Sequence, residues 1–332
     1  MPYHQILKQS FIFILFCVIA VGCGGGGKDN PVAGLPRCNA AFDSSPKANA
    51  TTTTGFIVYQ NCTKGLSITD IATGTTTVLF DEIEEGPRSA SDPAPSPDGT
   101  KIVFMMTDES KCSGASSIQV FNRDTGTTTS ITDLTVNCLE KAEDKTPYFL
   151  NNGSIVFHRF ASDLNNIYQT TLTGTTTLLV AHATRPIPSR DGSVLYFLQD
   201  DTESISGVYA MTIGTTTITK VSTSTSTPEE NFAVAPNGTI VVVRESELSK
   251  IPFIAVIKAN GSYGEIVLQG NPDQDSYGGA ISWNTTNDKI VVEVSNQIEG
   301  SSMVLIKMAG GIAVDSEVIA TFANDGGVAF MP

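Results

Sequence analysis

The stretch that decides the fold reads PSPDGTKIVF and occupies residues 95–104. It joins a turn flanked by prolines to an apolar run, and weaker copies begin at Phe149, Pro188 and Val234, with a diverged copy over Trp283–Asp288. An Asp-Gly or Asn-Gly pair before a β-branched run indicates a tight hairpin, because both residues tolerate positive φ. The chain is therefore built from a repeated β-hairpin unit.

The spacing of the copies predicts the fold class. The turn glycines, or the residue in their place, are 54, 39, 46 and 50 residues apart, and each unit contains four β-rich runs. In the second unit we expect strands at 92–96, 102–106, 118–122 and 128–133. Four antiparallel strands every 40 to 50 residues or so form the blade of a β-propeller. We therefore expect an all-β protein with six four-stranded blades over residues 55–332.

The first unit lacks its first strand. Only the runs at 56–59, 66–70 and 76–80 are present, whereas the C-terminal residues 327–331 resemble the missing strand and end where Pro97 stands in the first copy. Pairing this C-terminal strand into blade one would remove an open sheet edge. The sequence therefore predicts a ring that is closed by its last residues.

These features resemble the TolB-type propeller repeat, whose consensus runs roughly Trp-Ser-Pro-Asp-Gly and continues into an apolar strand ending in Phe. The resemblance extends over about residues 55–332, and it is strongest at 95–104 and 188–197. It implies a six-bladed propeller but no particular function, since propellers include binding proteins, enzymes and substrate gates. Trp283 occupies the Trp position of the repeat, and we expect it to pack in the core near the channel. We expect the same of four other aromatic residues, Tyr148, Phe149, Phe232 and Phe330.

The N-terminus resembles the signal of a bacterial lipoprotein. Residues 1–22 contain one lysine and then a short apolar run, which is typical of a secretory signal and too short to span a membrane. The sequence AVGC at residues 20–23 resembles the lipoprotein cleavage box, in which Cys23 carries the lipid. Residues 23–54 begin with four glycines after Cys23 and read as a flexible tether. The resemblance implies an outer-membrane lipoprotein that faces the periplasm or is exposed at the surface.

Charge and cysteine content narrow the possible partners. The formal net charge is −14, and removal of residues 1–22 makes it −15 because only Lys8 is lost. An acidic chain with few basic runs argues against nucleic acid as a partner. Four cysteines remain in the mature domain besides Cys23, and an even number in an exported protein suggests disulfides.

The order of strands in a blade places the cysteines. Cys112 and Cys138 lie in connections on the same face of blade two, so a bridge between them is sterically reasonable. Cys38 would then pair with Cys62, although four cysteines allow three arrangements. A metal site is not expected, because no Cys-x-x-Cys spacing occurs.

The order of strands in a blade also assigns the acidic residues to one or the other face of the disc. Turns between the first and second strands, and between the third and fourth, lie on one face of the disc, and the other connections lie on the opposite face. The second face contains most of the acids, so we expect a negative surface at the channel mouth that attracts a basic segment. An equally good interpretation is that these acids only keep an exported protein soluble. The residues expected to form this binding surface are Asp81, Glu82, Glu84, Glu85, Glu143, Asp144, Glu229, Glu230, Asp273 and Asp275.

Catalytic and cofactor motifs are absent from the sequence. There is no Gly-x-Ser-x-Gly elbow, no P-loop and no Gly-x-Gly-x-x-Gly motif, and no cofactor is expected. We therefore interpret the chain as a non-enzymatic protein-binding or scaffolding module of the cell envelope. The alternative is an enzyme, such as a lyase or hydrolase, or a small-ligand or metal-binding propeller that uses channel carboxylates. The expected first strands consist mainly of Ala, Pro, Phe, Ile and Val, which argues against that alternative.

Overall fold

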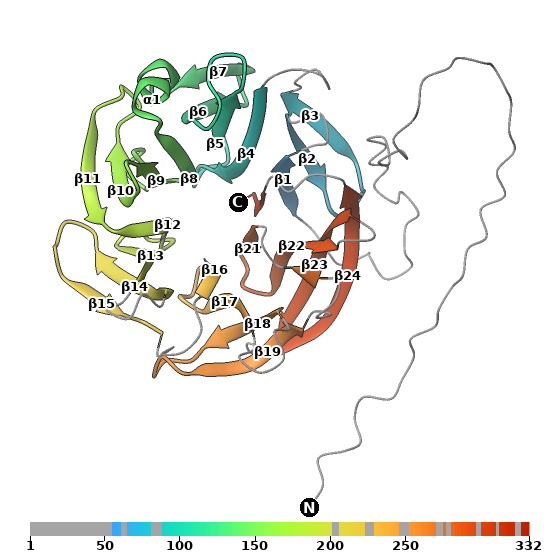
Figure 1. Cartoon of the computed structure of the whole chain (residues 1–332). Coiled ribbons are helices and arrows are strands. Elements are labelled where there is room, and N and C mark those ends of the chain that lie inside the picture. Colours follow the sequence, from blue (N-terminus) through green and yellow to red (C-terminus); the bar gives the residue numbers. More distant parts are fainter. Residues whose placement is uncertain are drawn as a thin grey trace, which may run out of the picture. The chain divides into compact units, whose positions relative to one another are not determined.

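The computed structural model arranges antiparallel sheets as a ring around a central axis (Figure 1). The expected signal peptide and tether, with Cys23 and Cys38, lie outside the described residues, as does Cys62. The structure describes residues 55–60, 65–80, 88–200, 206–222, 229–245, 252–269, 275–276, 280–296, 300–309, 312–322 and 327–331.

Within these residues the strands form six blades, and each blade runs from an inner strand to an outer strand. Blade one contains β25 (Val328–Phe330), β1 (Phe56–Gln60), β2 (Leu66–Asp70) and β3 (Thr76–Phe80). Blade two contains β4 (Arg88–Pro95), β5 (Lys101–Asp108), β6 (Ser116–Asn122) and β7 (Thr127–Ser130). Blade three contains β8 (Glu143–Phe149), β9 (Ile155–Ala161), β10 (Leu164–Thr170) and β11 (Thr176–Ala181).

The other three blades follow the same order. Blade four contains β12 (Ala183–Pro188), β13 (Val194–Asp200), β14 (Ser206–Thr212) and β15 (Ile218–Lys220). Blade five contains β16 (Glu229–Val234), β17 (Ile240–Glu245), β18 (Pro252–Ile257) and β19 (Tyr263–Gln269). Blade six contains β20 (Asp275–Ser276), β21 (Ile281–Trp283), β22 (Lys289–Asn296), β23 (Gly300–Ala309) and β24 (Ile312–Phe322).

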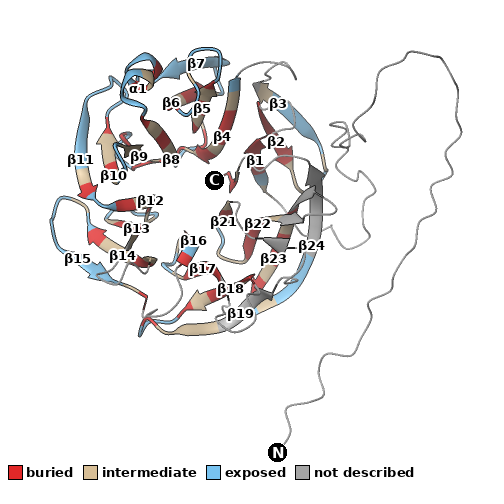
Figure 2. Ribbon diagram, in the orientation of Figure 1, coloured by how far each residue is buried: buried red, intermediate tan, exposed pale blue. Residues whose placement is uncertain are grey.

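The second strand of a blade is buried on both faces, and this explains its continuous apolar sequence. Ile102, Val103 and Phe104 on β5 are all fully buried. Both faces are covered because each blade packs against two neighbours, so the usual alternation of apolar and polar residues is lost. Outer strands such as β7 and β11 are largely exposed (Figure 2), which suits their threonine-rich sequences.

The hydrophobic core lies between the blades. Buried side chains of consecutive blades form clusters in turn around the ring, from blades one and two through to blades six and one. Trp283 packs in the cluster between blades five and six, and Phe149, Phe232 and Phe330 are buried in other clusters, as the sequence predicted. Tyr148 is an exception, because it is only half-buried and contacts three successive clusters.

The ring closes as predicted. β25 pairs antiparallel with β1, with Ile57 opposite Phe330 and Tyr59 opposite Val328. The backbone of Met331 adds a hydrogen bond to Phe56 O at 2.8 Å. Blade one therefore combines β1, β2 and β3 with an inner strand, β25, from the C-terminal residues.

Two local features differ from the prediction. The run expected as a strand at 128–133 ends at Ser130, and a short helix α1 (Leu134–Glu140) follows in the connection to blade three. Asp133 begins this helix by accepting a hydrogen bond from Thr135 N at 2.8 Å. The inner strand of blade six is divided into β20 and β21. No helix among the described residues is long and apolar enough to cross a membrane.

Aspartate side chains organise the hairpin turns between inner strands and their neighbours. Asp98 Oδ1 accepts hydrogen bonds from Ser96 Oγ at 2.6 Å and Thr100 N at 3.0 Å, and Gly99 follows with a φ of 70°. These bonds lower the pKa of Asp98 to about 2. Asn152 accepts the equivalent backbone bond in blade three, from Ser154 N at 3.0 Å.

Candidate functional site

The centre of the ring contains two cavities, one at each mouth. The first has a volume of about 500 Å³, is lined by the ends of the inner strands and by the hairpin turns, and opens on what we call the turn face. The second has a volume of about 360 Å³, is lined by the beginnings of the inner strands, and opens on the loop face, where the longer connections lie. Both cavities are lined by Tyr148, Ile187 and Ile281, so these side chains form the layer between them.

The turn-side cavity is lined by both apolar and polar side chains. Phe149, Trp283 and Phe330 line it together with prolines of the hairpin turns. Arg190 stands at its rim and donates a hydrogen bond from Nη1 to Thr285 O at 2.9 Å, which links blades four and six.

The loop-side cavity, which we call the vestibule, contains opposite charges on different blades. Lys145 on β8 and Arg185 on β12 come from blades three and four. Asp92 on β4 and Glu293 on β22 come from blades two and six. Gly327, which directly precedes the inner strand β25 of blade one, also lines the cavity. The vestibule is therefore basic on one side and acidic on the other.

A repeated bulge positions the charged side chains at the vestibule wall. The pairing of β4, β8 and β12 with their neighbours shifts register beside Asp92, Thr146 and Arg185, which have φ values of 50°, 47° and 50°. A proline follows each of these residues. Positive φ is costly for residues other than glycine, and the residue before a proline already has few allowed conformations. The surrounding ring must therefore hold these three residues in place.

Blade one packs closely against this bulge. Gly327 has a φ of 89°, and a Cβ there would lie 3.1 Å from both the N and Cα of Asp92. Glycine suits this position because it accepts the positive φ, and because any side chain would require the Asp92 backbone to shift by a few tenths of an ångström. The closing strand and the first charged residue of the vestibule therefore depend on each other.

The vestibule changes the ionisation of the groups inside it. Burial raises the pKa of the Asp92 carboxyl, although Arg185, the Thr146 N–H and Lys145 oppose the rise. Burial raises the pKa of Tyr148 to about 12, so its hydroxyl stays protonated. Burial lowers the pKa of His158, whose Nε2 lies 2.7 Å from Asn165 Oδ1. Tyr148 and His158 are therefore neutral at physiological pH, and the positive charges come from the lysine and the arginine.

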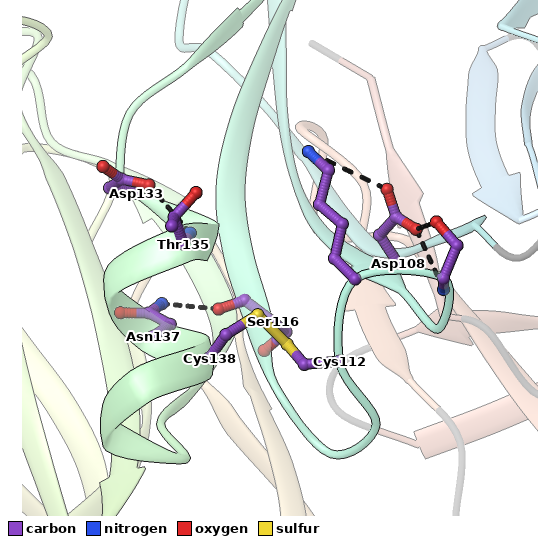
Figure 3. The surroundings of a disulfide bond; sticks show 9 residues. Asp108, Cys112, Ser116, Asp133, Thr135, Asn137 and Cys138 are labelled. Carbon is purple, nitrogen blue, oxygen red and sulfur yellow. Dashed lines mark hydrogen bonds and ion pairs between the residues drawn. A yellow bond between two sulfur atoms is a disulfide. The ribbon is translucent and has the colours of Figure 1, made fainter.

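The loop face is held in place by a disulfide. Cys112, in the connection after β5, bonds to Cys138 in α1, with a Cα–Cα distance of 5.7 Å (Figure 3). This confirms the pairing expected from the sequence. Next to the bridge, Asn137 donates a hydrogen bond to Ser116 O at 2.6 Å. The helix is thus fixed to β6 both covalently and by hydrogen bonding.

A buried ion pair fixes the beginning of blade three. Asp144 is fully buried and accepts hydrogen bonds from Arg159 Nε at 2.6 Å and Arg159 Nη2 at 2.8 Å. Asn137 Nδ2 adds a third bond to this carboxylate at 2.7 Å. The guanidinium also lies over the rings of Phe157 and Tyr168, at 5.6 and 5.5 Å from their centroids. Bidentate pairing satisfies both charges, which is the condition for burying them at tolerable cost.

A second buried carboxylate fixes the beginning of blade five. Glu229 is 1% exposed and accepts hydrogen bonds from Val208 N at 2.6 Å and Ser222 Oγ at 2.9 Å. Tyr263 OH donates a further bond to it. Glu229 therefore joins blade four to blade five below the loop face.

These positions correct part of the expected acidic surface. Asp144 and Glu229 are buried and bonded, because each satisfies backbone or arginine donors at the base of a connection, so they present no charge to solvent. Glu143 forms an ion pair with Lys145, and Glu230 is exposed. For Asp275 the structure describes only the backbone, in β20. Asp81, Glu82, Glu84, Glu85 and Asp273 lie outside the described residues.

The sequence prediction missed the vestibule. It placed Asp92 at the start of an expected inner strand and Arg185 just before the next-but-one, but it treated the inner strands as mainly apolar, whereas both charged residues lie within inner strands and line the channel. The signal that marks them is the X-Pro pair that recurs at Asp92, Thr146 and Arg185, near the start of three inner strands. Within the described part of the chain, no group of three or more His, Cys, Asp or Glu residues is placed to hold a metal ion.

Comparison with known proteins places the fold among distant propellers. No protein-family model and no curated protein sequence matches the chain. TolB from Acinetobacter baumannii superposes with a TM-score of 0.65 at 17% identity, over 84% of this chain and 67% of that one. A chain of the nidogen/laminin complex gives 0.56 at 10% identity, over 84% and 99%. An oligogalacturonate lyase in complex with manganese gives 0.54 at 14% identity, over 76% and 74%.

At these identities the similarity establishes the fold alone. The chain is an all-β propeller that is distantly similar in structure to TolB and to other propeller proteins. The similar structures include both enzymes and proteins named for their complexes, so function has to be argued from the residues of this chain.

Proposed function

We propose that this protein is a non-enzymatic, lipid-anchored propeller of the cell envelope that binds a protein partner through its loop face. The proposal rests on the interactions that hold the loop face rigid. The Cys112–Cys138 disulfide, the Asp144–Arg159 ion pair and the Glu229 hydrogen bonds all lie at the base of its connections. A surface that is already rigid loses less conformational entropy when a partner docks. Connections on a rigid scaffold are also where binding residues concentrate.

The charge of the chain indicates the kind of partner. The mature chain has a net charge of −15, and the sequence assigns most of its acids to the connections of the loop face. Glu230, at the beginning of β16, is exposed there. A negative surface raises the encounter rate with positively charged segments and disfavours acidic ones. The partner we propose is therefore an envelope protein that presents a basic segment.

The anchor defines where this binding takes place. A lipid on Cys23 and the glycine-rich tether after it would hold the propeller near the outer membrane, facing the periplasm or exposed at the surface. Several acyl chains together give stable membrane attachment, because each buried CH₂ contributes about 0.8 kcal/mol. The membrane is thus reached through the lipid, while the loop face remains available for the partner.

Opposite charges in the vestibule favour a second candidate function, the binding of a small ligand. Asp92 and Arg185 both line the channel wall although the sequence suggested an apolar channel. A chemical reaction would need a group that attacks or transfers a proton to a bound substrate. The contacts of the vestibule residues give no specific support to one reaction, so we propose binding rather than catalysis.

Charge reversal on the full-length protein tests the proposal. An epitope tag inserted after Gly27 leaves the closing strand unchanged, and partners are recovered after crosslinking in cells. The test variant is Glu85→Lys/Glu230→Lys, and the matched control is Asp124→Lys/Asp315→Lys. Asp124 follows β6 in a turn of the opposite face and Asp315 lies on the outer strand β24, and both are exposed.

Each double variant changes the net charge by the same amount, so the comparison separates a local surface from overall charge. We expect the test variant to lose most of the captured partner and the control to keep it. Capture should also weaken as salt rises, because exposed charge contacts are screened over about 10 Å at 0.1 M. Equal capture by both variants would show that the loop face is not the contact surface.

A further inference from the structure

Arg185 differs from Arg159, which also lies on a strand near a carboxylate. Arg159 donates two hydrogen bonds to Asp144 and a third to Asn137 Oδ1 at 3.3 Å. Arg185 makes no hydrogen bond or ion pair with any described residue, although it lines the vestibule and is only half-buried. Its guanidinium therefore keeps its full set of donors for a ligand in the cavity.

Asp92 also has unused capacity at the vestibule wall. Its carboxylate accepts a single hydrogen bond among the described residues, from Thr146 N at 3.3 Å. An ionised carboxylate has about four acceptor positions. By contrast, the buried carboxylates Asp144 and Glu229 each accept three bonds. The left-handed backbone at Asp92 and at Arg185 holds both residues at the wall of one cavity.

The charges balance only for a ligand that carries both signs. Lys145, which also forms an ion pair with Glu143, lines the cavity with Arg185 on the basic side. Glu293 lies fully buried behind the acidic side, where it accepts a hydrogen bond from Gly327 N at 3.3 Å. A purely anionic ligand would face Asp92 and Glu293, and a purely cationic one would face Arg185 and Lys145. Each would meet repulsion that a zwitterion avoids.

The floor of the vestibule indicates the rest of the ligand. Ile187 and Ile281 close the cavity toward the turn side, and the Tyr148 hydroxyl stays protonated there. A volume of about 360 Å³ is at the small end of ligand pockets. We propose that the vestibule binds a free α-amino acid with an apolar side chain, with its carboxylate on Arg185 and Lys145 and its ammonium group on Asp92. This inference does not depend on the protein partner proposed above.

Calorimetric titration of the unmodified protein with L-leucine and two analogues tests the need for both charges. 4-Methylpentanoate lacks the ammonium group of leucine, and 3-methylbutylamine lacks its carboxylate. A hydrogen bond to a charged group contributes about 1.5–3 kcal/mol, so each analogue should bind roughly 10- to 150-fold more weakly than leucine. The inference is overturned if an analogue binds as tightly as leucine, or if none of the twenty common amino acids binds with a Kd below about 10 mM.

Substitutions then locate the site. We expect Arg185→Gln and Asp92→Asn each to weaken amino-acid binding by about 10-fold or more, because each removes one charged contact. Arg190→Gln is the matched control, since it makes the same change at the opposite mouth of the channel. Unchanged binding in Arg185→Gln, or equal loss in Arg190→Gln, would contradict the assignment. Because the analogue titrations use the unmodified protein, a variant that fails to fold does not leave the inference untested.

Discussion

Replacing Cys112 and Cys138 with serine should destabilise the loop face by a predictable amount. The two cysteines are 26 residues apart, and the closed loop contains β6, β7 and most of α1. In the chain-entropy description, a crosslink over a loop of this length lowers the entropy of the unfolded chain by about 12 cal/mol/K, or about 3.5 kcal/mol at 25 °C. α1 has only seven residues, too few to be stable without tertiary contacts. The helix α1 should therefore be the first element to lose its structure.

Urea unfolding of the double variant and of the oxidised parent protein measures this contribution. We expect the free energy of unfolding to fall by about 2–4 kcal/mol. The slope of this free energy against urea concentration must be the same for both proteins, because a different slope would indicate a change in the compactness of the unfolded state. Hydrogen exchange should accelerate at Asn137 and Cys138 before it does at Phe104 on the buried strand β5. A loss below about 1 kcal/mol, with unchanged exchange in α1, would refute the claim that the disulfide fixes this connection.

Three further predictions follow from the fold. Phe330→Ala should lower the free energy of unfolding by about 3–5 kcal/mol in denaturant titration, because it leaves a cavity at a buried position of the closing strand. Phe56→Ala on the partner strand should lower it far less, because that side chain is 45% exposed. Arg159→Met should cost about 3–5 kcal/mol because it leaves a buried carboxylate without its cation, and adding Asp144→Leu should recover much of that loss in the same titration. Acid should destabilise the protein as pH falls from about 4 to about 2, because the turn aspartates have a pKa of about 2 instead of 3.8 and stop stabilising the fold once they are protonated. NMR titration should measure these pKa values, and asparagine variants should reduce the acid sensitivity. The aspartates concerned are Asp98, Asp191 and Asp288.

Much of the fold could be predicted because the repeat encodes it locally. Four of the hairpin turns have their own Asp-Gly or Asn-Gly pair, and the second strands are apolar runs. The closing strand at 327–331 was recognisable because it supplies a piece that the first unit lacks. The Cys112–Cys138 bridge followed from the order of strands in a blade. These features need no information beyond a single repeat and its neighbours.

What could not be predicted depends on contacts between blades. α1 has no helical periodicity of its own, and it is held by the disulfide and by Asn137, whose partners come from β6 and β8. Asp144 and Glu229 looked like surface acids, but their burial depends on donors that are distant in the sequence. An acidic residue in a connection therefore does not by itself indicate a surface charge.

The candidate site was missed for a related reason. Asp92, Thr146 and Arg185 lie at bulges of the inner strands, and all three line the channel wall there. The X-Pro pairs mark these positions, but their effect depends on the ring that holds a strained backbone in place. Tyr148 was expected in the core, yet it lies between the two cavities and contacts three clusters.

Site-specific photocrosslinking in cells tests most directly the claim that the loop face is the recognition surface. A photoreactive amino acid replaces either Glu230, exposed on the loop face, or Asp124, exposed on the turn face, in the full-length protein. We expect a discrete crosslinked protein from position 230 and none from position 124, and less of the product at high salt. A crosslink from position 124 alone, or equal products from both positions, would contradict it.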